Sequence, residues 1–291
     1  MTTGRLTAVR RPPPDRLVVD GLSVERYAAL DGGSTAAAPV LFVHGTGDRA
    51  AGLRRTARFL PNRRLAAYDR RGYAGSLDAG SASSVDEMVA DAVAVAACLD
   101  GPVLLVGHSM GGHIALRALE RTDAAEHFVG AVVWEPPMPD ADWYDAPIAA
   151  GGLPAVDEVG ERFFRLMVGD EVWRRLPDSL RAQRRAEGPA LLADLVSIRR
   201  PGAAVRYERI GLPVVVGAGT ESPTRHRRSA AETAERVGVP LTVVTGADHG
   251  VHLSYPAVFA RLVEQWPSHG GAFDATPVSR PAAEPTTEDA V

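Results

Sequence analysis

The sequence places a serine between glycines directly after an apolar run. These residue types at this spacing favour nucleophilic chemistry. The apolar residues 103–106 are followed by Gly-His-Ser-Met-Gly-Gly at residues 107–112, and a helical pattern begins near Ile114. An apolar run bounded by glycine predicts a buried strand, so we expect Ser109 at a turn between a strand and a helix. Such a turn strains the serine backbone, exposes its hydroxyl, and needs small residues where the helix passes the strand. The pattern predicts that Ser109 is a nucleophile.

The segments that accompany this serine decide its interpretation, because a glycine-rich turn with an incidental serine has the same pattern. Upstream, the apolar residues 39–43 end in His-Gly-Thr-Gly at residues 44–47. Downstream, the apolar run 240–245 leads into Gly-Ala-Asp-His-Gly at residues 246–250. Between them, residues 68–76 read Tyr-Asp-Arg-Arg-Gly-Tyr-Ala-Gly-Ser.

In these four segments, and in their order, the chain resembles the α/β-hydrolase superfamily, in the branch with a His-Gly oxyanion loop and a Gly-His-Ser-Met-Gly elbow. The loop 68–76 is similar to the family's D-x-R-G-x-G-x-S segment, with Ala74 where a second glycine is usual. The resemblance covers roughly residues 15–267. It implies an α/β fold, in which helices flank a mostly parallel sheet and a helical cap is inserted after strand six.

The alternation of apolar runs with helical patterns agrees with that fold. It predicts a mostly parallel sheet with helices on both faces and an active site at the carboxyl ends of the strands. An Asp-Gly pair at residues 20–21 lies between apolar runs and predicts a hairpin. The other expected strands are 40–44, 65–68, 103–107, 128–134, 214–217 and 241–245.

The domain organisation follows from where this alternation stops. From residue 136 to about residue 206, apolar residues recur at helical spacing, which corresponds to the family's cap. We expect a core of residues 15–135 and 207–267, a cap of residues 136–206, and flexible termini at residues 1–14 and 268–291. The last segment is rich in proline, alanine, threonine and acidic residues, which is typical of disorder. Aromatic residues of the cap that could line an apolar pocket are Trp143, Tyr144, Phe163, Phe164 and Trp173.

A serine hydroxyl becomes a good nucleophile only when a base takes its proton, so the chain must supply a histidine. Of its eight histidines, His249 lies on a glycine-flanked loop after the last expected strand, where the resemblance places the base. His252 matches the family's helix-start segment and is interpreted as structural, and His44 as ordering the oxyanion loop. His226 is assigned to a polar surface pattern.

The carboxylate that orients this histidine has two candidates. The resemblance places the acid of most members after the seventh strand, in a Gly-x-x-Asp turn, and this chain has Glu221 in the corresponding segment. The competing residue is Glu135, which ends an apolar strand and is followed by two prolines that fix its direction. Some branches of the family have their acid there. We favour Glu135 and keep Glu221 as the alternative.

The oxyanion of an acyl-transfer reaction needs preorganised N–H donors. The resemblance implies that the backbone amides of Thr46 and Met110 provide them. The alternative that residues 44–47 bind phosphate is weak, because the Gly-Lys-Ser/Thr ending of a P-loop is missing.

Composition and charge exclude several classes of protein. The chain has 291 residues, a formal net charge of −4 and 45% hydrophobic residues, which is typical of a single globular unit without the basic field that attracts nucleic acid. All 32 basic residues are arginine, which excludes Schiff-base chemistry through lysine. The single cysteine, Cys98, lies in an apolar helical pattern, and no Cys/His cluster has the spacing of zinc ligands. We expect no metal and no organic cofactor.

The expected environment follows from the absence of targeting patterns. The first residues lack the apolar segment of a signal peptide, and no stretch approaches the ~18 to 20 apolar residues that span a bilayer. We expect a cytoplasmic protein with a small-molecule substrate and with no nucleic-acid or membrane partner. The sequence does not indicate an oligomeric state.

The expected function is that of a serine hydrolase, which cleaves an ester, thioester or lactone of a small apolar substrate through an acyl-enzyme. Ser109 attacks, His249 transfers protons, and Glu135 or Glu221 orients the histidine. Two alternatives remain open at this point. The same triad could transfer an acyl group to another acceptor or assist acetate elimination, and a non-catalytic ligand-binding protein could have the same fold. Fold alone does not decide among them.

Overall fold

An eight-stranded sheet forms the centre of the molecule. The computed structural model describes residues 6–30, 37–141 and 156–266. The strand order is β1-β2-β4-β3-β5-β6-β7-β8; β2 pairs antiparallel with β1 and β4, and the other neighbours pair parallel. The strands are β1 (Asp15–Val19), β2 (Leu22–Tyr27), β3 (Val40–Val43), β4 (Leu65–Tyr68), β5 (Val103–His108), β6 (Phe128–Trp134), β7 (Val214–Gly219) and β8 (Leu241–Val244). The mostly parallel sheet and the hairpin that the sequence predicts are confirmed.

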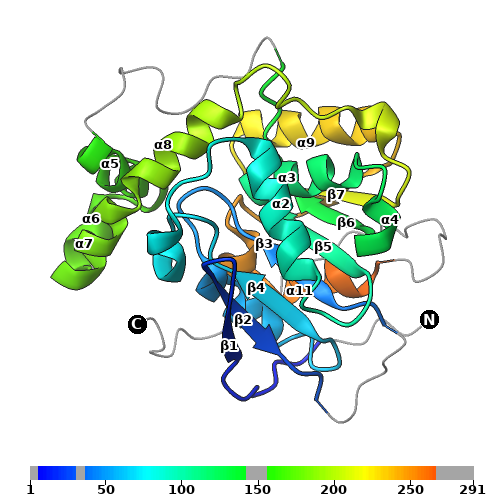
Figure 1. Cartoon of the computed structure of the whole chain (residues 1–291), viewed down its shortest axis with the longest axis horizontal. Coiled ribbons are helices and arrows are strands. Elements are labelled where there is room, and N and C mark those ends of the chain that lie inside the picture. The colour runs from blue at the N-terminus through cyan, green and yellow to red at the C-terminus, as the bar shows by residue number, and fades with distance from the viewer. Residues whose placement is uncertain (1–5, 31–36, 142–155, 267–291) are drawn as a thin grey trace.

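Helices cover both faces of this sheet (Figure 1). Helices α2, α3 and α9 pack on one face, and α1 and α11 pack on the other. The α-helices are α1 (Arg54–Ala57), α2 (Val85–Ala96), α3 (Met110–Leu119), α4 (Ala124–His127), α5 (Val156–Val168), α6 (Asp170–Arg175), α7 (Asp178–Ala186), α8 (Gly188–Ser197), α9 (Thr224–Val237), α10 (Val251–Ser254) and α11 (Pro256–Glu264). Short 3-10 helices are η1 (Ala50–Leu53), η2 (Ala74–Ala79) and η4 (Tyr207–Arg209).

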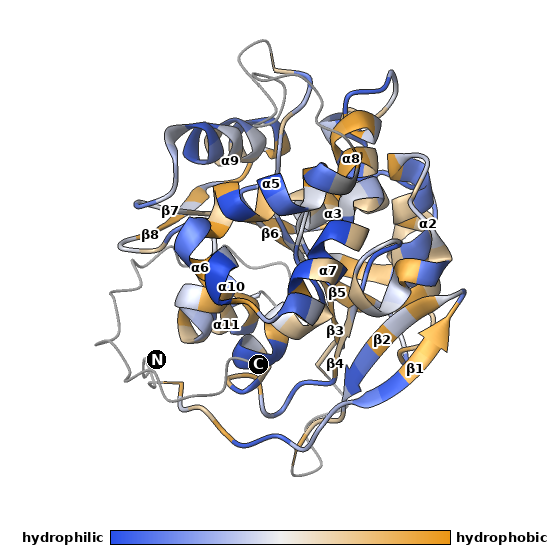
Figure 2. Ribbon diagram, turned by 90° about the vertical axis from the view of Figure 1, so that its left-hand side faces the viewer, coloured by the Kyte–Doolittle hydropathy of each residue, from blue (hydrophilic) through white to orange (hydrophobic). Residues whose placement is uncertain are grey.

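Alternating burial along each central strand divides the core into two layers. In β3, Leu41 and Val43 pack toward α2 and α3, whereas Val40 and Phe42 pack toward α1 and α11. Successive strand residues point to opposite faces, and both faces are covered, so the strand is apolar throughout. This is why the sequence shows continuous apolar runs. Figure 2 shows the contrast with α9, which is mostly hydrophilic along its length.

The helical insertion predicted after the sixth strand is confirmed, because α5 to α8 all lie between β6 and β7. We call these four helices the cap. Its own apolar cluster consists of Val159, Phe163 and Leu191. Of the other aromatic residues that the sequence names as possible pocket residues, Phe164 and Trp173 pack on each other with ring centroids 5.7 Å apart. Trp143 and Tyr144 lie outside the described residues.

The N-terminal segment that the sequence describes as flexible contacts the body from residue 6 onward. Leu6 and Ala8 pack against the core layer under α1 and α11. The guanidinium of Arg11 donates to five backbone carbonyl oxygens, those of Ala28, Ala57, Leu60, Pro61 and Arg63. Residues 1–5 and the predicted C-terminal tail, 268–291, lie outside the described residues.

Across the described ranges, no helix combines the length and apolar character needed to cross a membrane.

Candidate active site

Ser109 lies at the turn from β5 into α3 that the sequence predicts. Its φ is 52° and its ψ is −121°, a conformation that L-residues rarely adopt and that concentrates at functional sites. Every other residue from Val103 to Glu120 is buried, and only Ser109 is partly exposed. Its backbone N–H donates to the carbonyl oxygen of Trp134 at 2.9 Å, which ties the turn to the end of β6. The turn therefore presents one hydroxyl from an otherwise buried segment.

Two of the glycines around this serine, Gly107 and Gly111, have no room for a side chain. A Cβ on Gly111 would lie 1.9 Å from the carbonyl oxygen of Val43, and a Cβ on Gly107 would lie 2.4 Å from that of Gly111. Atoms this close overlap, so α3 could not pass β3 and β5 at this distance with any other residue. The requirement for small residues at 107 and 111 is thus a requirement of packing.

Glu135 and His249 form a hydrogen-bonded pair at the ends of β6 and β8. His249 Nδ1 donates to Glu135 Oε2 at 2.7 Å, and the Gly219 N–H donates to Glu135 Oε1 at 2.9 Å. The Glu135 side chain is fully buried and that of His249 is 11% exposed. A carboxylate with both oxygens bonded is held in one orientation, so the Nδ1–H tautomer of His249 is favoured and Nε2 has a free lone pair.

The alternative acid, Glu221, lies elsewhere. It is exposed after β7, and its carboxylate accepts a hydrogen bond from the Thr220 hydroxyl at 3.1 Å. The structure brings Glu135, and not Glu221, to His249. Asp248, next to His249 in the sequence, accepts from Ser254 at 3.2 Å.

A cavity of about 90 Å³ brings the remaining candidate residues together. Ser109, His249, Thr46 and Met110 all line it. The Ser109 hydroxyl makes no hydrogen bond with His249 in the described structure, and such bonds often form only when substrate is bound. Further lining residues come from the cap and from the start of α9: Phe163, Met167, Asp194, Leu195, Ile198, Arg225 and His226.

The two backbone amides expected to bind an oxyanion are both unengaged. Among the described residues, neither the Thr46 nor the Met110 N–H donates to another protein group. The side chain of Thr46 is occupied instead, because its hydroxyl donates to Asp194 at 2.9 Å. A free N–H beside a cavity that also contains Ser109 is available to a developing negative charge.

His44 holds the loop that contains Thr46 against the segment after β4. The Arg70 backbone N–H donates to Nε2 at 2.9 Å, and Nδ1–H donates to the Gly45 carbonyl at 2.7 Å. Burial, assisted by the charge of Arg70, lowers the pKa of His44 to about 3. The imidazole is therefore neutral near pH 7, with one nitrogen accepting and the other donating. The structural role inferred from the sequence agrees with these bonds.

Asp194 ties the cap to the same loop, a role that the sequence pattern does not indicate. Its carboxylate, in α8, accepts from both terminal nitrogens of Arg70 at 2.9 and 2.6 Å, from the Tyr73 hydroxyl at 2.8 Å and from the Thr46 hydroxyl at 2.9 Å. Burial opposes the charge of Arg70, but the contact with Asp194 holds the pKa of Arg70 above its ordinary value. The only signal in the sequence is a single acid inside the apolar segment 190–196.

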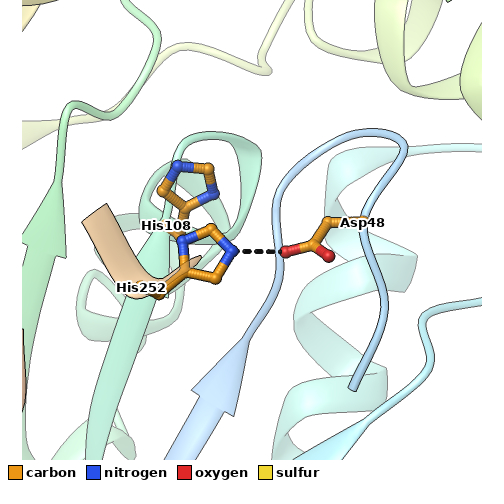
Figure 3. A group of neighbouring side chains, drawn as sticks. All are labelled: Asp48, His108 and His252. Atoms are coloured by element: carbon orange, nitrogen blue, oxygen red, sulfur yellow. Dashed lines mark hydrogen bonds and ion pairs between the residues drawn. The ribbon is translucent and has the colours of Figure 1, made fainter. Parts of the chain in front are cut away.

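A second histidine–carboxylate pair lies close by (Figure 3). His252 donates from Nε2 to Asp48 at 2.8 Å, and its ring centroid is 4.4 Å from that of His108. His108 in turn donates from Nε2 to the His249 carbonyl at 2.7 Å. Burial opposes ionisation of Asp48, but His252 holds the pKa of Asp48 below its usual range. Burial, together with the neighbouring imidazoles, holds the pKa of His108 well below its usual value. This group supports the backbone on both sides of the cavity.

The sequence pattern assigns His226 to a polar surface, and this prediction is wrong. His226 is in the first turn of α9, and its ring stacks on that of His249 with centroids 3.8 Å apart and an interplanar angle of 16°. Burial, then the charges of His249 and Arg225, lower the pKa of His226 to about 2. A neutral imidazole thus packs flat against His249. The amphipathic pattern of α9 hid this contact, because it does not show which residues of the first turn face the cavity.

Within the described part of the chain, two groups of side chains bring potential metal ligands within 4.8 Å of one another: Asp48, His108 and His252, and Glu135, His226 and His249. In each group a histidine already donates to the carboxylate, at 2.8 Å and 2.7 Å respectively. The histidine–carboxylate bonds satisfy the buried charges, so we assign neither group to a metal.

The fold, the serine turn and the histidine–carboxylate pair define the class of protein. A sequence model described as the Alpha/beta hydrolase family matches residues 40–262. The chain belongs to this family and is a hydrolase. No curated protein matches the chain.

Solved structures share the fold at low sequence identity. An alpha/beta hydrolase from Sphaerobacter thermophilus DSM 20745 is 22% identical, with 84% of this chain and 99% of that chain covered and a TM-score of 0.58. The enol-lactonase from Burkholderia xenovorans LB400 is 17% identical, with coverages of 86% and 98% and a TM-score of 0.60. A thermophilic esterase from Thermogutta terrifontis is 17% identical, with coverages of 87% and 97% and a TM-score of 0.62.

Proposed function

We propose that this protein is a serine hydrolase that cleaves an ester, thioester or lactone through an acyl-enzyme, with Ser109, His249 and Glu135 as its triad. The observation that carries the proposal is the 2.7 Å hydrogen bond from His249 to the fully buried Glu135, beside a cavity that Ser109 also lines. A buried carboxylate that fixes the tautomer of a histidine is what a general base next to a serine needs.

Each step of the reaction then has a named group. His249 Nε2 takes the hydroxyl proton as Ser109 Oγ attacks the carbonyl carbon, and Glu135 stabilises the imidazolium. The backbone amides of Thr46 and Met110 donate to the oxyanion. When the intermediate collapses, His249 protonates the departing alcohol or thiol and Ser109 carries the acyl group. Water, deprotonated by His249, attacks the acyl-enzyme and releases the acid and free Ser109.

The lining of the cavity supports a small substrate with an apolar part. Met110, Phe163, Leu195 and Ile198 contribute apolar surface, and the volume of about 90 Å³ is small. The proteins of similar fold include, by their descriptions, an enol-lactonase, an esterase and a thioesterase domain. These descriptions agree with an ester-like bond as the point of cleavage.

Labelling by a fluorophosphonate tests the nucleophile directly. We expect one covalent adduct on Ser109 in the folded wild-type protein and none in Ser109→Ala, which should keep the thermal stability of the wild type because it removes one partly exposed oxygen. A folded wild-type protein that stays unlabelled would contradict the proposal. A panel of esters, thioesters and lactones with product analysis then separates hydrolysis from acyl transfer and elimination.

A further inference from the structure

The charges that line the cavity do not cancel. Asp194 lines it, but both of its oxygens bind the buried guanidinium of Arg70. Glu135 bonds to His249, and burial keeps His226 neutral. Arg225 is the one arginine among the described residues that line the cavity. It contributes a positive charge that no lining carboxylate offsets.

Among the described residues, two other arginines of α9 have acidic partners, whereas Arg225 and Arg227 have none; of the latter two, only Arg225 lines the cavity. Arg228 pairs with Glu232 at 2.9 Å, and Arg236 pairs with Asp140 at 2.6 Å. In the part of the chain that the structure describes, no carboxylate forms an ion pair with Arg225, and the first turn of α9 contains no acidic residue. The N-terminus of a helix adds a partial positive charge of its own. The positive end of the largely hydrophilic α9 (Figure 2) thus lies at the cavity wall without an anion.

We propose that Arg225 is a substrate-binding residue that pairs with a carboxylate group of the substrate. The substrate class is an ester, thioester or lactone that also carries a carboxylate, with an apolar part against Phe163 and Leu195. This inference rests on the proposed function, because it names the substrate class of the same cavity. A guanidinium binds a carboxylate through two parallel hydrogen bonds. Arg225 is the one arginine among the described lining residues, and its single charge matches that of a carboxylate.

Two matched pairs of esters test this assignment. Monophenyl glutarate is compared with phenyl valerate, so that the carboxylate is on the acyl part, and 4-carboxyphenyl acetate with phenyl acetate, so that it is on the alcohol part. We expect the wild type to favour the carboxylated member of one pair in kcat/KM by about tenfold, the lower range for a hydrogen bond between charged groups. Most of the difference should be in KM, and it should shrink as salt is added.

Variants of α9 locate the effect. Arg225→Gln should reduce the ratio of kcat/KM for the carboxylated to the neutral ester about tenfold, and Arg225→Lys should retain part of it. Arg227→Gln is the matched control, since Arg227 is exposed on the same helix, bonds only to the Thr224 hydroxyl and does not line the cavity. Ligand-detected NMR measures the equilibrium binding of valerate and valeramide to the Ser109→Ala variant, and so tests the same subsite without turnover.

The outcomes separate this inference from the function on which it rests. If neutral esters are hydrolysed but neither the wild-type preference nor the Arg225→Gln effect exists, the carboxylate subsite is wrong and the hydrolase stands. If Arg227→Gln changes the ratio as much as Arg225→Gln, the effect is long-range charge and the subsite is also wrong. If Ser109 is not labelled and no ester reacts, the proposed function itself fails, and the valerate comparison alone then decides whether Arg225 binds carboxylates.

Discussion

Two residues of the proposed triad share an uncommon backbone conformation. Ser109 has a φ of 52° and Glu135 a φ of 45°, both in a region that non-glycine residues avoid. Each is the first residue after a central strand, where the chain must turn sharply while its side chain points toward His249 or the cavity. Such strain persists only where the surrounding structure enforces it. Here the Glu135 N–H donates to the Gly217 carbonyl at 3.1 Å, and the Ser109 N–H donates to Trp134.

Replacing each candidate acid by its amide separates their roles. Glu135→Gln keeps the side-chain size and removes the charge that fixes His249, so we expect kcat to fall on the order of 10² to 10⁴, in line with the equivalent Asp→Asn change in a serine protease. Glu221→Gln should leave kcat nearly unchanged, because its exposed carboxylate bonds to Thr220. The measurement is steady-state hydrolysis of any ester that the wild type cleaves. An active Glu135→Gln beside a crippled Glu221→Gln would reverse the assignment.

The elements were predictable to the extent that they depend on local pattern. The central strands are continuous apolar runs because both faces of the sheet are covered, and Gly107 and Gly111 mark the close passage of α3. The contacts of Asp194, Arg225 and His226 could not be predicted. Asp194 meets Arg70 across 124 positions of sequence, and hydropathy does not show which residues of α9 turn toward the cavity.

Two neighbouring glycines of α3 test the packing of the elbow. Gly111→Ala places a Cβ against the Val43 carbonyl, so we expect the free energy of unfolding to fall by about 3 kcal/mol or more, at the upper end of overpacking costs. Gly112→Ala is the control, because its Cβ would meet neighbours only at 3.2 Å and beyond. Its effect should stay within about 1 kcal/mol, the size of the helix-propensity gain. Urea denaturation measures both, and equal effects would contradict the packing account.

The tie between the cap and the core is also an element-scale feature. Asp194→Asn leaves the buried guanidinium of Arg70 without a charged partner, so we expect a loss of about 3 to 5 kcal/mol in the free energy of unfolding. Replacing both partners by apolar residues, as in Asp194→Leu with Arg70→Met, should restore part of that stability. Denaturation curves of the two variants provide the comparison. If the double variant is less stable than the Asp194→Asn variant, the unpaired charge of Arg70 is not the cause of the stability lost in Asp194→Asn.

At the scale of the whole molecule, buried neutral histidines couple stability to pH. Burial lowers the pKa of His44 to about 3 and that of His226 to about 2, and it also lowers those of His108 and His113. In the unfolded chain these groups titrate near pH 6.5. Below that pH the unfolded state takes up protons that the folded state does not, so acid favours unfolding. Above pH 6.5 both states are neutral and the groups contribute nothing.

We therefore expect the free energy of unfolding to be level from about pH 8 to pH 7 and to fall as the pH drops below about 6.5. Below about pH 6.5, each such histidine lowers the free energy of unfolding by about 1.4 kcal/mol per pH unit, until the pH reaches the pKa of that histidine in the folded state. Urea denaturation at a series of pH values measures this slope. His226→Gln should make the slope shallower by one histidine's share, and a flat profile between pH 7 and pH 5 would contradict the account.

The hydroxyl of Thr46 bonds to Asp194 of the cap, and Thr46 also lines the cavity. In the proposed mechanism its backbone amide binds the oxyanion, so this shared residue couples access to reactivity. A displacement of α8 that widened the cavity would pull on the segment that contains the proposed oxyanion donor. The pocket would then be most open when its electrostatic stabilisation is weakest, and water admitted with the cap displaced would meet a less reactive Ser109. Bulky substrates would accordingly have a lower kcat as well as a higher KM, because a displaced cap also distorts the catalytic geometry.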